Sequence, residues 1–407
     1  MLDRLNTLLR RPAQACLSLF CAAAVLTGCG GGGGVADAQP AEARSAFASG
    51  PITGFGSIIV NGVRFDDSTA SVTDDDGNSR RSDDLRLGMM VEVSGAGITR
   101  DAVGSHSRAS VIRFGSEIVG PVSSIAADGK SLVVLGQTVQ ITASTLFDDR
   151  LAGGLGALVA GSSVVEVHGL LDTSTGSYTA TRIEPKANAP FYKLRGVVSS
   201  IDKAAHTLKI GSGTDTISYD GIAADVPAAL DKGVLVRVRL KSAQVGGLWI
   251  ATHVESGVRR MGDHDEAELR GTITATTFSV DRKFSLNGLP VDATSALFPK
   301  GTAGIVLGAR VEVEGRVVNG VVVATHVSTE SEQEREHVGF ELHGMISNFD
   351  AAARTFMLRG VKVSFAGDVE FRSGMMGDLA HGRMVDVTGT RSSDGTQLIA
   401  IRIGFGH

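Results

Sequence analysis

The chain has 407 residues, of which 43% are hydrophobic and 20% are charged, and its formal net charge is −5. This length exceeds what one hydrophobic core usually serves, so the sequence indicates several small domains. The net negative charge excludes nucleic acid as an expected partner, because affinity for nucleic acid depends mainly on Lys and Arg that neutralise phosphates.

Residues 1–28 have the pattern of an export signal. Arginines precede an apolar stretch from Cys16 to Leu26 that is too short to span a bilayer. The following Leu26-Thr27-Gly28-Cys29 resembles the lipobox of bacterial lipoproteins, in which the cysteine is acylated and becomes the first residue of the mature chain. The resemblance implies that Cys29 is a lipid anchor and that a membrane is a partner. An ordinary secretory signal is the alternative.

The chain contains no cysteine after Cys29, so the mature protein has no disulfide and no Cys-ligated zinc. Residues 29–49 are rich in Gly and Ala and show no apolar period, which predicts a flexible tether. The domains beyond it must therefore be stabilised by β packing and by contacts with one another.

One pattern recurs five times after the tether, about every 70 to 76 residues. A segment opening with Gly is followed by a Val-x-Val-x-Gly element and an Ala-Thr ending, with Asn-Gly or Asp-Gly turns between them. Alternating β-branched residues and such turns are typical of short strands joined by hairpins. The predicted repeats are residues 50–115, 116–184, 194–255, 268–328 and 339–403.

A Leu-x-x-Gly sequence before the fourth strand predicts one short helical turn, with Ala223 to Leu230 as the best helix candidate. Three strands, a short helix and two strands is the order of an OB-like barrel. We therefore expect an all-β chain of five tandem small antiparallel β-barrels, each with at most one short helix. We expect the first two repeats to be docked and the later joints to be looser.

The repeats resemble an uncharacterised family of Gram-negative bacterial lipoproteins built of domains of unknown function. The resemblance covers nearly all of residues 50–403 and is carried by Ile52-Thr53-Gly54-Phe55-Gly56-Ser57-Ile58, by the run from Leu85 to Gly95, and by the Ala-Thr endings. It implies a location and an architecture. It implies no activity, because the family has no assigned catalytic residues.

Candidate sites in the sequence are weak. Asp74 to Asn78 packs oxygen ligands around a turn, so it is either a weak Ca²⁺ site or, as we favour, a solvated hairpin tip. Asp263 to Glu266, with His253 or His337, offers ligands for a divalent ion, although a solvated linker is the simpler interpretation. His168, His253 and His326 are interpreted as isolated surface residues. We predict no metal site, no cofactor and no catalytic residue.

Few aromatic residues remain for ligand contacts. Tyr178, Phe191, Tyr192 and Trp249 are candidates for stacking on a sugar, whereas Phe147, Phe298 and Phe371 recur at one repeat position and are expected to fill the cores.

We expect a lipid-anchored envelope protein that acts as a non-enzymatic binding or structural module, with an envelope protein or a glycan as its partner. Gly30 after the anchor favours the outer membrane by resemblance to enteric sorting. The alternatives are a glycan or peptidoglycan binding protein, and an enzyme with a site between repeats.

Overall fold

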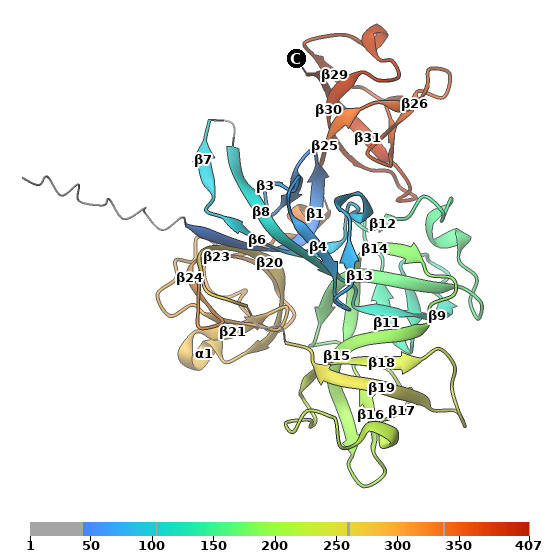
Figure 1. Ribbon diagram of the computed structural model, residues 1–407, viewed down its shortest axis with the longest axis vertical. Helices are drawn as coiled ribbons and strands as arrows, with labels where there is room; N and C mark the ends of the chain where they lie inside the picture. The colour runs from blue at the N-terminus through green and yellow to red at the C-terminus, as the bar shows by residue number, and fades with distance from the viewer. Residues whose placement is uncertain (1–43, 103, 259–260, 337, 407) are drawn as a thin grey trace, which may run out of the picture. The chain divides into compact units, whose positions relative to one another are not determined.

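The computed structural model describes residues 44–102, 104–258, 261–336 and 338–406, which form one compact unit. The predicted export signal and Cys29 lie outside the described residues. Within them the chain is all-β, with short helical turns only, which confirms the predicted fold class (Figure 1). Five closed barrels are present in these ranges, one for each sequence repeat.

Every barrel has the same strand connectivity. In repeat 2, strand β9 pairs with β10, β10 with β11, β11 in parallel with β14, β14 with β13, and β13 closes the ring onto β9. This is the order of an OB-like barrel. Its strands are β9 (Ile118–Ile125), β10 (Ser131–Val134), β11 (Gln137–Gln140), β13 (Val164–Asp172) and β14 (Ser177–Pro185).

The other barrels close in the same way. Repeat 1 contains β1 (Ser45–Phe55), β2 (Ile58–Val60), β3 (Val63–Asp66), β6 (Met90–Ala96) and β8 (Gly104–Gly115). Repeat 3 contains β15 (Phe191–Asp202), β16 (Thr207–Ile210), β17 (Ile217–Ser218), β18 (Leu235–Lys241) and β19 (Trp249–Ser256). Repeat 4 contains β20 (His264–Thr276), β21 (Lys283–Leu286), β22 (Leu289–Asp292), β23 (Arg310–Val318) and β24 (Val321–Thr329). In repeat 5 the first strand is divided, giving β25 (Phe340–Met345), β26 (Ser347–Asp350), β27 (Thr355–Leu358), β28 (Val361–Ser364), β30 (Met384–Arg391) and β31 (Leu398–Phe405).

Short elements complete the repeats. The extra strands are β4 (Ser71–Asp74), β5 (Ser79–Arg80), β7 (Thr99–Asp101), β12 (Leu146–Phe147) and β29 (Glu370–Arg372). The helical turns are η1 (Ser82–Asp84), η2 (Gly154–Ala157), η3 (Asp220–Ile222), η4 (Met376–Asp378), α1 (Phe278–Asp281) and α2 (Glu332–Glu336).

The glycine of the Val-x-Val-x-Gly element lies at a bulge where the fourth strand meets the fifth. In repeat 2 the register shifts between His168 and Gly169, and a Cβ on Gly169 would lie 2.4 Å from the carbonyl oxygen of Thr179. Such an approach excludes any side chain, which explains the recurring glycine. Repeat 3 places Leu240 at the equivalent shift, and nothing in the structure explains that exception.

The expected helix from Ala223 to Leu230 is wrong. The chain forms only η3 and then turns. Pro227 lacks an N–H donor and disfavours helical geometry at the residue before it, which prevents a continuous helix here. The Asp220-Gly221 pair lies inside η3 and makes no hairpin.

The predicted tether ends earlier than expected, because residues 45–49 form the first half of β1. Ala46 and Ala48 pack into the core of repeat 1, whereas Phe47 packs into the core of repeat 4. A strand buried on both faces shows no polar alternation, so residues 45–49 carry no apolar period that would predict a strand.

The first strands also join the repeats to one another. Residues 46–49 of β1 pair in parallel with residues 266–269 of β20, and Gly54 and Phe55 pair with β25. Strand β9 pairs with β15, which connects repeats 2 and 3. Repeats 1 and 2 are in contact, since the Thr181 hydroxyl donates to the Gly88 carbonyl at 2.6 Å. The expectation of looser later joints is wrong for repeats 2 and 3, which share this strand pairing, and repeats 4 and 5 also pair with strand β1 of repeat 1.

Candidate functional site

The tip of the β4–β5 hairpin is built around one carboxylate. Asp74 Oδ1 accepts hydrogen bonds from the N–H groups of Asp76 at 3.0 Å and Asn78 at 2.8 Å. Its Oδ2 accepts from Arg80 Nη2 at 2.7 Å. Although burial alone raises the pKa of Asp74, the bonds from Asn78 and Arg80 outweigh it and hold that pKa below its usual value. The tip is therefore a rigid turn that presents the next two aspartates outward.

These two aspartates dock onto repeat 3 instead of facing solvent. Lys193 Nζ of β15 lies 2.8 Å from Asp75 Oδ1 and 3.1 Å from Asp76 Oδ2. Arg237 of β18 binds Asp75, and Arg239 Nη2 lies 2.7 Å from Asp76 Oδ1. We call this set of five residues the hairpin socket. The prediction of a solvated hairpin tip is thus wrong for Asp75 and Asp76, which repeat 3 covers, whereas Gly77 and Asn78 are exposed.

Most of the hairpin socket is buried, although the Arg239 side chain at its edge is 39% exposed. The side chains of Lys193 and Asp75 are 9% and 4% exposed. Burial lowers the pKa of Lys193, but the carboxylates of Asp75 and Asp76 outweigh burial, so this pKa lies above its usual value. Arg239 also stacks over the Phe191 ring, with its guanidinium carbon 4.4 Å from the ring centroid. The charges bind one another, which is the arrangement of a structural contact. A cavity of about 350 Å³ lies beside them.

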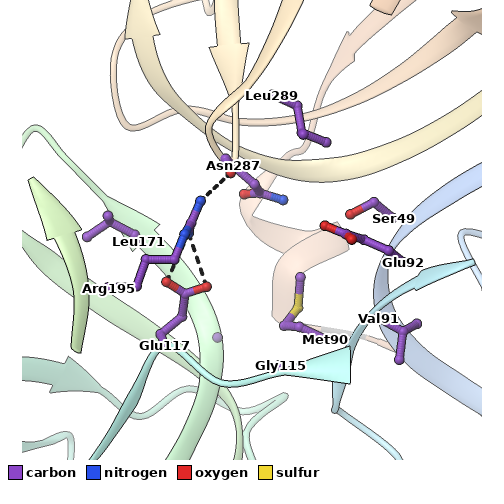
Figure 2. A pocket seen from close by; sticks show the side chains of 11 residues that line it. Ser49, Met90, Val91, Glu92, Gly115, Glu117, Leu171, Arg195, Asn287 and Leu289 are labelled. Carbon is purple, nitrogen blue, oxygen red and sulfur yellow. Dashed lines mark hydrogen bonds and ion pairs between the residues drawn. The ribbon is translucent and has the colours of Figure 1, made fainter. Parts of the chain in front are cut away.

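A second polar contact lies between repeats 2, 3 and 4 (Figure 2). Arg195 Nη1 lies 3.0 Å from Glu117 Oε2, and Arg195 Nη2 donates to the Asn287 carbonyl at 2.5 Å. Arg195 Nε also donates to the Gly257 carbonyl at 2.9 Å. We call these four residues the central joint. The cavity beside them measures about 40 Å³, about enough for a water molecule and too small for a substrate.

A third contact connects β7 of repeat 1 with β20 of repeat 4. Arg100 Nη1 lies 2.9 Å from Glu266 Oε2, and its Nη2 lies 2.6 Å from Glu268 Oε1. Burial and the nearby Glu314 carboxylate raise the pKa of Glu268 to about 7, against the opposing effect of Arg100. Because a carboxyl group with this pKa changes its charge near neutral pH, we expect this contact to depend on pH.

The predicted ligand-stacking aromatics are mostly buried. Tyr178 is fully buried and donates its hydroxyl to the Arg195 carbonyl at 2.5 Å, and burial raises its pKa. Trp249 is 8% exposed and donates Nε1–H to Asp215 Oδ2 at 3.1 Å. Tyr192 packs edge-on against Trp249, and Phe191 is covered by Arg239. Three of these four possible ligand contacts are therefore buried, and Arg239 covers the ring of the fourth.

The expected core phenylalanines do pack inward. Phe147 is buried in the shared core of repeats 2 and 3, and Phe298 and Phe371 are half-buried against the cores of their own repeats.

The residues considered as candidate metal ligands have separate partners. His264 Nδ1 lies 2.9 Å from the Gly262 carbonyl, Asp265 binds Ser45, and Glu266 binds Arg100. His337 lies outside the described residues. In the ranges that the structure covers, no group of three His, Cys, Asp or Glu is arranged to hold a metal ion.

The surface histidine interpretation holds for two residues of three. His253 and His326 are exposed, whereas His168 is completely buried with Nδ1 2.8 Å from the Gly115 carbonyl. Strand β13 is buried on both faces where repeats 1 and 2 meet. Alternation along one strand does not show that a neighbouring repeat packs against its polar face.

Sequence reasoning missed Lys193, Arg195 and Arg237. Each stands on a strand of alternating charged and apolar residues, which normally indicates one solvated face. The opposite charges of the aspartate run and of the basic strand residues were the only feature of the sequence that could have predicted this contact. Using it requires knowing which repeats meet.

Over residues 44–102, 104–258, 261–336 and 338–406, no helix has the length and apolar character needed to cross a membrane.

Comparisons with known proteins support the repeat architecture. The sequence model of a family described as a domain of unknown function (DUF5666) matches residues 49–97, 119–184, 270–328 and 343–404. Repeat 3 is not among the matched segments, although it forms the same barrel. The curated proteins include no match. A solved structure described as "drosophila Unr CSD456" is 13% identical, covers 54% of this chain and 98% of its own, and has a TM-score of 0.14, at which the likeness carries no argument.

Proposed function

The chain belongs to the DUF5666 family, and we propose that it is an exported, lipid-anchored envelope protein whose barrels form a non-enzymatic binding or structural module. Residues 1–28 supply the export signal in this proposal, and acylated Cys29 holds the protein to a membrane, which Gly30 favours as the outer membrane. The partner is an envelope protein or a glycan. Nucleic acid is not a partner.

One observation carries the structural part of this proposal: the repeats are held together by buried charge pairs in addition to strand pairing. The hairpin socket connects repeats 1 and 3, and the central joint connects repeats 2, 3 and 4. Separating the two members of a buried ion pair leaves an uncompensated charge, which is energetically costly. Such pairs therefore resist movement of one repeat relative to another. A module that holds partners at set positions needs such fixed joints, since no disulfide follows Cys29.

The anchor is tested by metabolic labelling with radioactive palmitate in a Gram-negative host. We expect the full chain to incorporate label and to fractionate with the outer membrane, and Cys29→Ser to lose both properties. Cys16→Ser is the matched control, because it removes a thiol from the export signal and leaves the acylated position intact. Equal labelling of the wild-type chain and Cys29→Ser would exclude the anchor.

The non-enzymatic role is supported by how the inter-repeat carboxylates are used. Asp75, Asp76 and Glu117 each bind a buried cation from another repeat. Glu268 has the pKa expected of a general acid or base, so it is the residue to test. Purified protein is expected to turn over no ester, phosphoester or glycoside substrate. Turnover that Glu268→Gln abolishes would establish an enzyme instead.

A further inference from the structure

A large cavity lined by arginines that lack some of their hydrogen-bond partners lies away from the joints described above. Its volume is about 720 Å³, within the range of cavities that hold small ligands. Four cationic side chains line it, from the β9–β10 turn, β23, α2 and the end of β30. They are Lys130, Arg310, Arg335 and Arg391, and we call the space they line the Arg cavity. The only Asp and Glu among its described lining residues are Glu332 and Asp394.

The carboxylates that line the Arg cavity do not neutralise its four cationic side chains. Asp394 is engaged in its own turn, where it accepts hydrogen bonds from the Ser392 hydroxyl at 2.6 Å and the Thr396 hydroxyl at 2.9 Å. Among the described residues, Lys130, Arg335 and Arg391 form no ion pair within 4 Å. The lining therefore carries excess positive charge, in a protein whose net charge is −5.

Arg310 shares its carboxylate with another arginine. Its side chain is 14% exposed, and its Nε lies 3.5 Å from Glu330 Oε2, too far for a good hydrogen bond. Arg270 Nε is closer to Glu330, at 2.6 Å from Oε1. Burial, together with the charges of Arg270 and Arg335, lowers the pKa of Arg310 although Glu330 opposes this shift. The Glu330 carboxylate thus lies near two guanidinium groups, and Arg310 Nε has no hydrogen-bond acceptor.

Arg391 is also incompletely satisfied. Its Nη1 lies 3.5 Å from the Ala143 carbonyl, and its buried Nε has no hydrogen-bond partner. Burial lowers its pKa, only partly opposed by Asp394. Buried guanidinium donors without acceptors are costly, and an oxyanion supplies the missing acceptors.

We infer that the Arg cavity is a binding site for a small ligand that carries carboxylate or phosphate groups on a carbon skeleton. Arg310 and Arg391 would bind the oxyanion groups in the fork geometry that suits both anions. Ile141, Phe147 and Leu155 supply apolar wall for the skeleton. The inference rests on the proposed binding role and names the chemistry of one ligand. It does not depend on Cys29.

Titration calorimetry of the mature chain tests this site, at low salt because exposed charges are screened by ions. The probes are trigalacturonic acid for carboxylates on a carbon skeleton, fructose 1,6-bisphosphate for phosphates on a carbon skeleton, and maltotriose as the neutral control. We expect saturable binding of at least one anionic probe and none of maltotriose. The anionic probe that binds shows whether the site prefers carboxylate or phosphate groups.

Variants then locate the bound anion. Arg310→Gln and Arg391→Gln should each weaken binding about tenfold or more, as expected for a lost charge-assisted bond. Arg354→Gln, an exposed position in repeat 5, should leave binding unchanged. Lys130 is exposed, so Lys130→Gln should weaken anion binding with little effect on the stability of the fold.

Two outcomes would overturn the inference. One is no binding of either anion at millimolar concentration, and the other is binding that none of the three cavity variants weakens. Loss of membrane association by Cys29→Ser with intact anion binding would separate the two proposals.

Discussion

The hairpin socket and the Arg cavity both place Lys and Arg side chains where different repeats meet, yet their charges are balanced differently. In the hairpin socket, Lys193 and its two arginine neighbours meet Asp75 and Asp76 at hydrogen-bond distance. In the Arg cavity, Arg310 and Arg391 have buried donors without acceptors. The comparison teaches that the same residue types close a joint when matched and leave an anion site when unmatched.

The largest effect is expected in the hairpin socket. Lys193→Met should lower the free energy of unfolding by about 3–5 kcal/mol, because Asp75 and Asp76 would remain buried with less positive charge. Urea unfolding followed by circular dichroism measures this change. Lys203→Met is the matched control, since Lys203 is 61% exposed in a surface pair with Asp231 and should change stability by about 1 kcal/mol or less. Equal losses for the two variants would refute the buried joint.

The contact between repeats 1 and 4 should depend on pH through Glu268. Its folded pKa of about 7 lies above the usual 4.5, so the folded state binds this proton more tightly and stability falls as pH rises between these values. Glu268→Gln mimics the protonated form. Above pH 7 it should be more stable than the wild type, by at most about 3 kcal/mol, and the difference should vanish below pH 4.5.

Thermal unfolding of both proteins across this range measures the effect. Glu314→Gln sharpens the test, because removing that carboxylate should lower the pKa of Glu268. The pH range over which stability falls should then become narrower. An unchanged difference between wild type and Glu268→Gln at every pH would contradict the assignment.

A double-mutant cycle measures how closely the socket charges are coupled. Asp75→Asn and Lys193→Met should be less harmful together than the sum of their separate effects, with a coupling free energy of about 1–3 kcal/mol. Urea unfolding of the four proteins supplies the values. Additive losses would mean that the two side chains do not interact.

The smallest effect is expected in the Arg cavity. Arg391→Leu should change the free energy of unfolding by only about 0.5 kcal/mol, or raise it slightly, because it removes a buried charge that has no strong partner. The same urea experiment compares it directly with Lys193→Met. A loss of several kcal/mol would show that Arg391 is a structural residue and would remove the contrast between the two regions.

The strands and their repeat were predictable because they depend on local chemistry. The Asn61-Gly62 turn, for example, forms with both residues at positive φ, of 52° and 79°, which Asn and Gly adopt readily. The environments of the candidate site residues were harder to predict from the sequence. Trp249 looked like a free aromatic because the sequence does not show that Asp215 and Tyr192 contact it.

The sequence by itself determined five β-barrels, since alternating valines and recurring glycines act over a few residues and specify each strand, turn and bulge. The tertiary structure alone decided that Asp75 and Asp76 are buried, that Tyr178 faces inward, and that Arg310 and Arg391 share one cavity. These outcomes depend on which repeats pack together. A repeated sequence gives every repeat similar edges, so only the summed strand pairing and charge matching between distant segments selects the partners.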